Sequence, residues 1–174
     1  MSEHKTAKLR GIPVGEDISA LDKVRALTWA NSGDAGESGW GSAMLSEDVE
    51  LISASATPVG SSICRFTVKP KHCNRLNNLH GGCTATLFDW LTTSALAPIA
   101  KPGYWQYAGV SRTLNVTYIK PVPVGETVLV ECSIVHAGRR LCTINGIMKR
   151  ESTGEVLAIC EHGKVSIDPE VPKI

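Results

Sequence analysis

One long helical segment lies between two groups of strand-like segments, and this order constrains the fold more than any other feature. In residues 81–97, Leu87, Leu91 and Ala95 recur at a spacing of four, which places an apolar stripe along a helix. Segments with strand patterns precede and follow this helix: residues 49–56, 61–68, 108–119, 126–136, 140–150 and 155–167. The order predicts an α+β fold, in which an antiparallel sheet wraps around a long central helix.

A chain of 174 residues predicts one domain with short extensions at its ends. Asp17 or Ser19 can cap a short helix that ends near residues 31–33, and a Gly/Ser-rich loop follows, with Trp29 and Trp40 as expected anchors. We therefore divide the chain into an N-terminal helical extension, a main domain and a C-terminal tail: residues 1–47, 48–167 and 168–174.

Composition excludes several classes of function. The 18 basic residues are scattered among 17 acidic ones, and no basic stripe alternates with aromatic residues, so nucleic-acid binding is not expected. No apolar run approaches the ~18 residues of a membrane span, and the first ten residues lack the hydrophobic part of a signal peptide. We expect a soluble intracellular protein, cytoplasmic or mitochondrial.

Metal and cofactor sites are not expected either. The six cysteines form no C-x-x-C pair, and no His, Cys and carboxylate set has the spacing of metal ligands. We interpret the cysteines as free buried thiols. The sequence contains neither a phosphate-binding P-loop nor H-E-x-x-H, so we predict a reaction without metal or cofactor.

The start of the long helix carries the residues with chemical potential. His80-Gly81-Gly82 follows a polar loop, and the backbone N–H groups of such a helix start have no helical partners and can polarise a carbonyl. Asp89 lies in the middle of the helix, with no Lys or Arg three or four residues away, and can supply the complementary base. A solvated carboxylate on the outer face of the helix is the alternative interpretation.

The spacing of these groups predicts an oligomer. Gly81 and Asp89 are separated by about 12 Å along one helix, whereas reacting groups must approach to roughly 3–3.5 Å. Two helices packed antiparallel across a two-fold axis can place the start of one beside the middle of the other. We therefore expect a site shared between two copies of the chain.

Several separate segments carry residue types and spacings that are typical of one protein family. They are Asn74–Asp89, Gly109-Val110-Ser111, Asn115–Tyr118, Pro121, Gly125-Glu126, Gly138-Arg139-Arg140 and Gly154. Together these segments, within residues 48–167, resemble the hotdog-fold acyl-CoA thioesterases of the phenylacetate-degradation and thioesterase-superfamily-member type. The resemblance implies a hotdog fold, a homodimer or homotetramer, and hydrolysis of an acyl-CoA thioester to free acid and CoA.

The resemblance also implies roles for individual residues. Gly81 N–H would polarise the thioester carbonyl, and Asn74 would help to hold the attacking water. Asp89 of the partner chain would be general base or nucleophile, and Ser111 would orient the water or Asp89. We assign substrate binding to Gly82, Tyr118, Lys120, Pro121, His136, Gly138, Arg139 and Arg140.

Two of these assignments have structural alternatives. His80 could act as a general base, although a His at this position more often fixes the loop by hydrogen bonds. Arg139 and Arg140 could belong to a solvated hairpin, or their guanidinium groups could bind the phosphates of CoA, which the resemblance favours.

Three other functions are alternatives. A hotdog hydratase or dehydratase would carry a G-D-x-N-P segment, which is missing. A non-catalytic acyl-CoA binder would tolerate loss of the carboxylate, whereas Asp89 is present. A serine hydrolase would need G-x-S-x-G, but residues 36–40 end in Trp40 in place of the final glycine.

Overall fold

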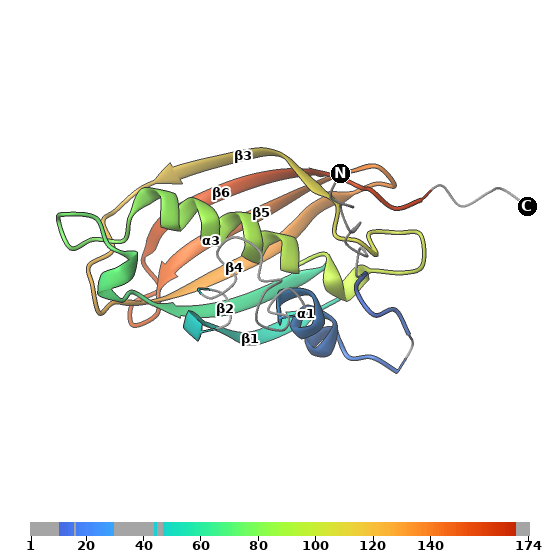
Figure 1. Cartoon of the computed structure of the whole chain (residues 1–174), viewed down its shortest axis with the longest axis horizontal. Helices are drawn as coiled ribbons and strands as arrows, with labels where there is room; N and C mark the ends of the chain where they lie inside the picture. Colours follow the sequence, from blue (N-terminus) through green and yellow to red (C-terminus); the bar gives the residue numbers. More distant parts are fainter. Residues whose placement is uncertain (1–10, 16, 30–43, 45–46, 170–174) are drawn as a thin grey trace, which may run out of the picture.

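A computed structural model describes residues 11–15, 17–29, 44 and 47–169 of the chain. Six antiparallel strands form one sheet in the order β1-β2-β4-β5-β6-β3, and the sheet curves around the long helix α3 (Figure 1). The strands are β1 (Val49–Ser55), β2 (Ser61–Thr67), β3 (Val110–Tyr118), β4 (Thr127–Ala137), β5 (Leu141–Arg150) and β6 (Val156–Val165). The helices are α1 (Ala20–Trp29), α3 (Gly81–Ser94) and two short 3₁₀ turns, η1 (Pro70–His72) and η2 (Ala97–Ile99). The predicted strands and helices are thus confirmed, with differences at their ends.

Helix α3 packs against strands β2 to β6 through the apolar stripe seen in the sequence. Leu87, Phe88 and Leu91 are at most 1 % exposed. Gly146 of β5 lies directly under the helix, where an added Cβ would come within 2.8 Å of Phe88 Cδ1 and 2.9 Å of Thr92 Cγ2. The missing side chain therefore lets the helix lie close to the sheet.

The long helix ends at Ser94, earlier than the expected residue 97. After Ser94 the backbone hydrogen bonds span three residues, from Ala95 to Thr92 and from Leu96 to Thr93. Pro98 has no N–H with which to continue the α-helical ladder. The helix therefore tightens into the 3₁₀ turn η2.

The N-terminal helix α1 is confirmed, and Ser19 caps it because its Oγ accepts a hydrogen bond from Asp22 N at 3.1 Å. A small second core joins α1 to the region after α3; its buried members are Ile12, Val24, Ala97, Ala100 and Ala108. Trp40, the side chain of Trp29 and residues 36–40 lie outside the described residues. No described helix is long and apolar enough to cross a membrane.

All six cysteines are free thiols, as predicted, but only four are buried: Cys64, Cys132, Cys142 and Cys160. Cys73 and Cys83 are half-buried, because both line a cavity beside the start of α3.

Strand β3 forms one edge of the sheet and pairs only with β6. It is largely exposed on both faces: Val110 and Tyr118 are 50 % and 55 % exposed, and only Leu114 and Val116 are half-buried. An edge strand leaves one row of backbone N–H and C=O groups without strand partners. This edge is therefore available to pair with another strand.

Candidate active site

The start of α3 is fixed by His80, which is the N-cap residue of the helix. Its Nδ1 accepts a hydrogen bond from Gly82 N at 3.0 Å, and its own backbone N donates to His72 O at 2.9 Å. This bond agrees with the interpretation that His80 fixes the loop, and it occupies one of the two ring nitrogens. The role of His80 as general base stays a prediction. None of the described residues accepts a hydrogen bond from Gly81 N–H. Gly81 therefore presents an unpaired backbone donor at this helix start.

A buried ionic network holds the loop that leads to the helix. The Asp48 carboxylate contacts Lys69 Nζ at 2.5 Å, Lys71 Nζ at 2.7 Å and His72 Nε2 at 3.0 Å. Burial by itself raises the pKa of Asp48, but these hydrogen bonds outweigh burial and lower the pKa to about 2. Because His72 O accepts the His80 backbone bond, this network anchors the helix start.

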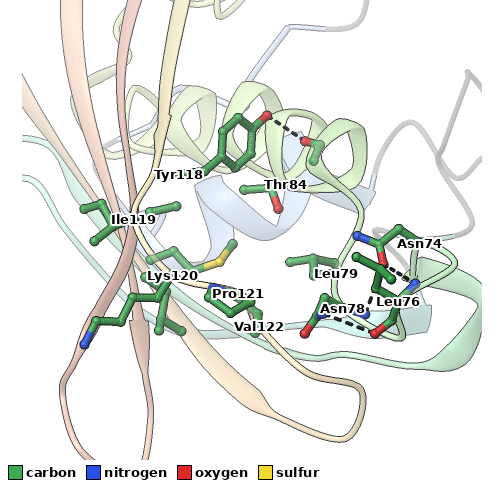
Figure 2. A pocket seen from close by; sticks show the side chains of 14 residues that line it. Asn74, Leu76, Asn78, Leu79, Thr84, Tyr118, Ile119, Lys120, Pro121 and Val122 are labelled. Carbon is green, nitrogen blue, oxygen red and sulfur yellow. Dashed lines mark hydrogen bonds between the residues drawn. The ribbon is translucent and has the colours of Figure 1, made fainter.

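Asn74 closes the polar loop before the helix. Its Oδ1 accepts hydrogen bonds from Leu76 N at 2.8 Å and Asn78 N at 3.3 Å (Figure 2). Asn77 adopts a left-handed φ of 56°, which Asn tolerates. Both backbone N–H groups are donors, so the Asn74 atom that they contact is the amide oxygen. The amide nitrogen Nδ2 is therefore the donor that remains. Among the described residues Nδ2 has no acceptor.

A cavity of about 340 Å³ lies between this loop, the start of α3 and the segment after β3 (Figure 2). It brings together five residues assigned from the sequence: Asn74, Gly81, Tyr118, Lys120 and Pro121. Tyr118 Oη donates to Gly81 O at 2.8 Å. Lys120 forms an ion pair with Glu155, and its amino group points away from Tyr118 and Asn74 in Figure 2. The volume is that of a small-molecule site.

Gly82 and His80 line a different cavity, of about 460 Å³, on the other side of the helix start. Met44, Cys73, Cys83 and Trp90 supply most of its apolar wall. The structure therefore separates Gly82 and His80 from the cavity that contains Gly81.

Asp89 is held from strand β3. Ser111 Oγ donates to Asp89 Oδ1 at 2.6 Å, and the carboxylate side chain is 38 % exposed. The contact between Ser111 and Asp89 that the resemblance implies is thus present. A half-exposed carboxylate with one hydroxyl donor keeps lone pairs available to an incoming group.

Two further charged or polar residues lie beside Asp89 and were not found from the sequence. His162 and Lys164 alternate along β6 and are buried toward α3, at 0 % and 3 % exposure. His162 Nε2 lies 3.4 Å from Asp89 Oδ1, and Lys164 Nζ donates to Thr93 Oγ1 at 3.0 Å. The sequence does contain a signal for His162 and Lys164. Both are polar side chains at β6 positions that face the core, where apolar residues are expected.

Burial lowers the pKa of both residues. Burial and the nearby Lys164 lower the pKa of His162 to about 4, although Asp89 opposes the shift. The imidazole is therefore neutral at pH 7. Burial also lowers the pKa of Lys164, and the Asp89 carboxylate again acts in the opposite direction.

The hairpin between β4 and β5 lies at the end of the molecule where Asp89 contacts Ser111. Val165 pairs with Val110 on one side and with Leu141 on the other, so the hairpin residues adjoin the start of β3. Trp105 Nε1 donates to Gly138 O at 2.8 Å and fixes the turn. The hairpin carries four assigned residues: His136, Gly138, Arg139 and Arg140.

The assigned residues consequently form two groups at opposite ends of one chain (Figure 1). Met148, which lines the cavity with Gly81, lies seven residues along β5 from Leu141, or about 23 Å at the rise of a strand. One chain therefore does not bring Arg139 and Arg140 to the Gly81 cavity. In the described part of the chain, no three His, Cys, Asp or Glu side chains gather as metal ligands.

Comparison with known proteins identifies the class. The family model for the thioesterase superfamily matches residues 76–157. Acyl-coenzyme A thioesterase 13 of Mus musculus is 34 % identical over 118 residues, which cover 68 % of this chain and 79 % of the relative. The crystal structure of zebrafish thioesterase superfamily member 2 has a TM-score of 0.71 and 30 % identity, and covers 85 % of this chain and 98 % of that one.

A more distant solved structure resembles the chain in fold alone. The E. coli PaaI protein from the phenylacetic acid degradation operon has a TM-score of 0.61 at 16 % identity, and covers 84 % of this chain and 92 % of its own. The antiparallel sheet around a central helix is the hotdog fold of thioesterases, as the resemblance implied. The chain belongs to the thioesterase superfamily.

Proposed function

We propose that this protein is an acyl-CoA thioesterase, which hydrolyses an acyl-CoA thioester to a free acid and CoA. The observation that carries the proposal is the pair of groups on α3. Gly81 lines a cavity and its N–H has no acceptor among the described residues, and a half-exposed Asp89 carboxylate is held by Ser111. Relatives named acyl-coenzyme A thioesterase 13 support acyl-CoA as the substrate class.

The proposed mechanism uses donors at the helix start and a base in the helix. Gly81 N–H polarises the thioester carbonyl, which stabilises negative charge on its oxygen. Asn74 Nδ2, the free donor of its loop, helps to hold the attacking water. Asp89 activates that water as a general base or attacks the carbonyl itself, and Ser111 keeps the carboxylate in place.

The site that we propose is shared between two chains of a homodimer. Gly81 and Asp89 are about 12 Å apart along their own helix, too far to act on one carbonyl. A two-fold axis beside the exposed edge of β3 would pair this strand with its copy in antiparallel orientation. The Tyr118 end of one chain, with its cavity, would then lie beside the partner's Asp89 and β4–β5 hairpin.

Six free thiols suit a reducing compartment. We therefore place the enzyme in the cytoplasm or in mitochondria.

A panel of acyl-CoA esters of different chain length tests the proposed activity. We expect free CoA thiol to be released with saturation kinetics from at least one ester, in a reaction that continues in the presence of a chelator. Binding of the esters without thiol release would instead identify a non-catalytic binder. Conversion of an enoyl-CoA without thiol release would identify a hydratase.

Replacing both hairpin arginines tests the placement of CoA. Arg139→Ala/Arg140→Ala should raise KM for an acyl-CoA ester far more than it lowers kcat, because phosphate contacts are equal in the ground and transition states. The matched control is the acyl-pantetheine thioester, which lacks the nucleotide phosphates and should show the same KM with wild type and variant. An unchanged KM for the full CoA ester would show that the two arginines do not bind the CoA phosphates.

A further inference from the structure

The hydrogen bonds of Thr92 determine which ring nitrogen of His162 carries the proton. Thr92 Oγ1 lies 2.6 Å from Phe88 O and 2.6 Å from His162 Nδ1, and all three residues are buried. A hydroxyl has one proton to donate, and a backbone carbonyl can only accept. Thr92 therefore donates to Phe88 O and accepts from His162 Nδ1–H.

The other ring nitrogen is consequently an unprotonated acceptor. The neutral imidazole holds its single proton on Nδ1, so Nε2 exposes a lone pair. Nε2 is fully buried and has no hydrogen-bond partner among the described residues. It faces Asp89 Oδ1 at 3.4 Å. Two acceptors face each other here, and a proton brought to Asp89 would join them in a hydrogen bond.

We propose that His162 is a positioning residue for Asp89, and that its Nε2 accepts a hydrogen bond from the Asp89 carboxyl group once this group has taken up a proton. The proposal rests on the proposed function with Asp89 as general base. The ring, held by Thr92 on one side, then stabilises the protonated carboxyl group and fixes its orientation. The buried nitrogen needs no contact with substrate to do so.

The proton is conserved through the reaction. When water attacks, an O–H bond of the water breaks, its oxygen bonds to the thioester carbon, and the proton passes to Asp89, where it lies between Oδ1 and Nε2. When the tetrahedral intermediate collapses, the C–S bond breaks and the thiolate sulfur takes this proton. His162 begins and ends the cycle with its proton on Nδ1.

Nitrogen-15 NMR of the histidine ring in the wild-type protein tests the tautomer without any substitution. We expect His162 at pH 7 to show a protonated Nδ1 and an unprotonated Nε2. In Asp89→Asn, the new amide can donate to Nε2, so the Nε2 resonance should shift toward that of a hydrogen-bonded nitrogen. A proton on Nε2 in the wild type, or an Nε2 resonance unaffected by Asp89→Asn, would overturn the proposal.

Two substitutions test the positioning role in catalysis. In His162→Asn the amide can still donate to Thr92 but offers nothing to Asp89, so kcat should fall by about two- to tenfold, as for a lost hydrogen bond between neutral groups. KM should stay within about twofold, because His162 is buried away from substrate. In His162→Gln the amide oxygen can replace the Nε2 acceptor, and most of the lost kcat should return. Glu161→Gln, exposed on the same strand, is the matched control and should behave as wild type.

The outcomes separate this proposal from the proposed function. Equal losses of kcat in the Asn and Gln variants, or a loss that appears in KM alone, would overturn the role of His162 while thioesterase activity remains established by the wild type. A wild-type protein that releases no thiol would overturn the proposed function, whereas the ring tautomer would still be read from the NMR spectrum.

Discussion

Replacing Asp89 with Asn is expected to lower kcat for acyl-CoA hydrolysis by about 10²–10⁴-fold, the usual loss for a positioned acid or base. The fold should remain intact, because the side chain is 38 % exposed and Ser111 Oγ can accept a hydrogen bond from the amide nitrogen of the variant. Thiol release gives kcat, and thermal unfolding reports the fold.

A second aspartate provides the control for this substitution. Asp22 lies on α1, is exposed and pairs with Arg25, so Asp22→Asn removes the same charge far from the candidate site. It should leave kcat unchanged. Turnover close to wild type in a folded Asp89→Asn protein would contradict the proposed mechanism, whichever of base or nucleophile Asp89 is.

Mixing two inactive variants should restore activity if the site is shared. Asn74→Ala and Asp89→Ala homodimers should each be nearly inactive, since every site carries one lesion. After joint unfolding and refolding in equal amounts, about half of the dimers should be mixed, with one intact site of two, so about a quarter of wild-type activity should return. Thiol release from the refolded mixture measures this recovery.

A control mixture shows whether the recovered activity requires an intact Asn74 in one chain and an intact Asp89 in the other. Refolding Asn74→Ala with the double variant Asn74→Ala/Asp89→Ala leaves the Asn74 lesion in every site, and no activity should return. Heterodimers of the two single variants that are verified by mass and still inactive would show that Asn74 and Asp89 act within one chain.

Local patterns in the sequence predict much of this fold. The four-residue spacing of Leu87 and Leu91 predicts a helix that buries one face. The prediction is confirmed, because burial in α3 follows the helical period. The end of the helix was placed too late, because the shift to 3₁₀ hydrogen bonds depends on Pro98 and on packing after Ser94. The cap bond of His80 agrees with the loop-fixing interpretation, since a helix cap involves only neighbours in sequence, and its role as general base stays a prediction.

The surroundings of Asp89 could not be predicted in the same way. His162 is 73 residues away in sequence and meets Asp89 only because β6 lies beside β3 under the helix. Sequence spacing contains no information on this strand order. The same limit applies to Arg139 and Arg140, whose position at the Asp89 end follows from the pairing of β5 with β6.

The cap formed by His80 also bears on how the acid product leaves. A helix start whose N–H groups are all free binds anions well, since several donors and the helix dipole act together. Here the Gly82 donor is already used by His80, whereas Gly81 lines the cavity and its N–H has no acceptor among the described residues. One donor is enough to polarise a single carbonyl oxygen during reaction. A carboxylate has two oxygens to satisfy and finds fewer donors than a phosphate-binding helix start would offer, so the cap favours release of the free acid.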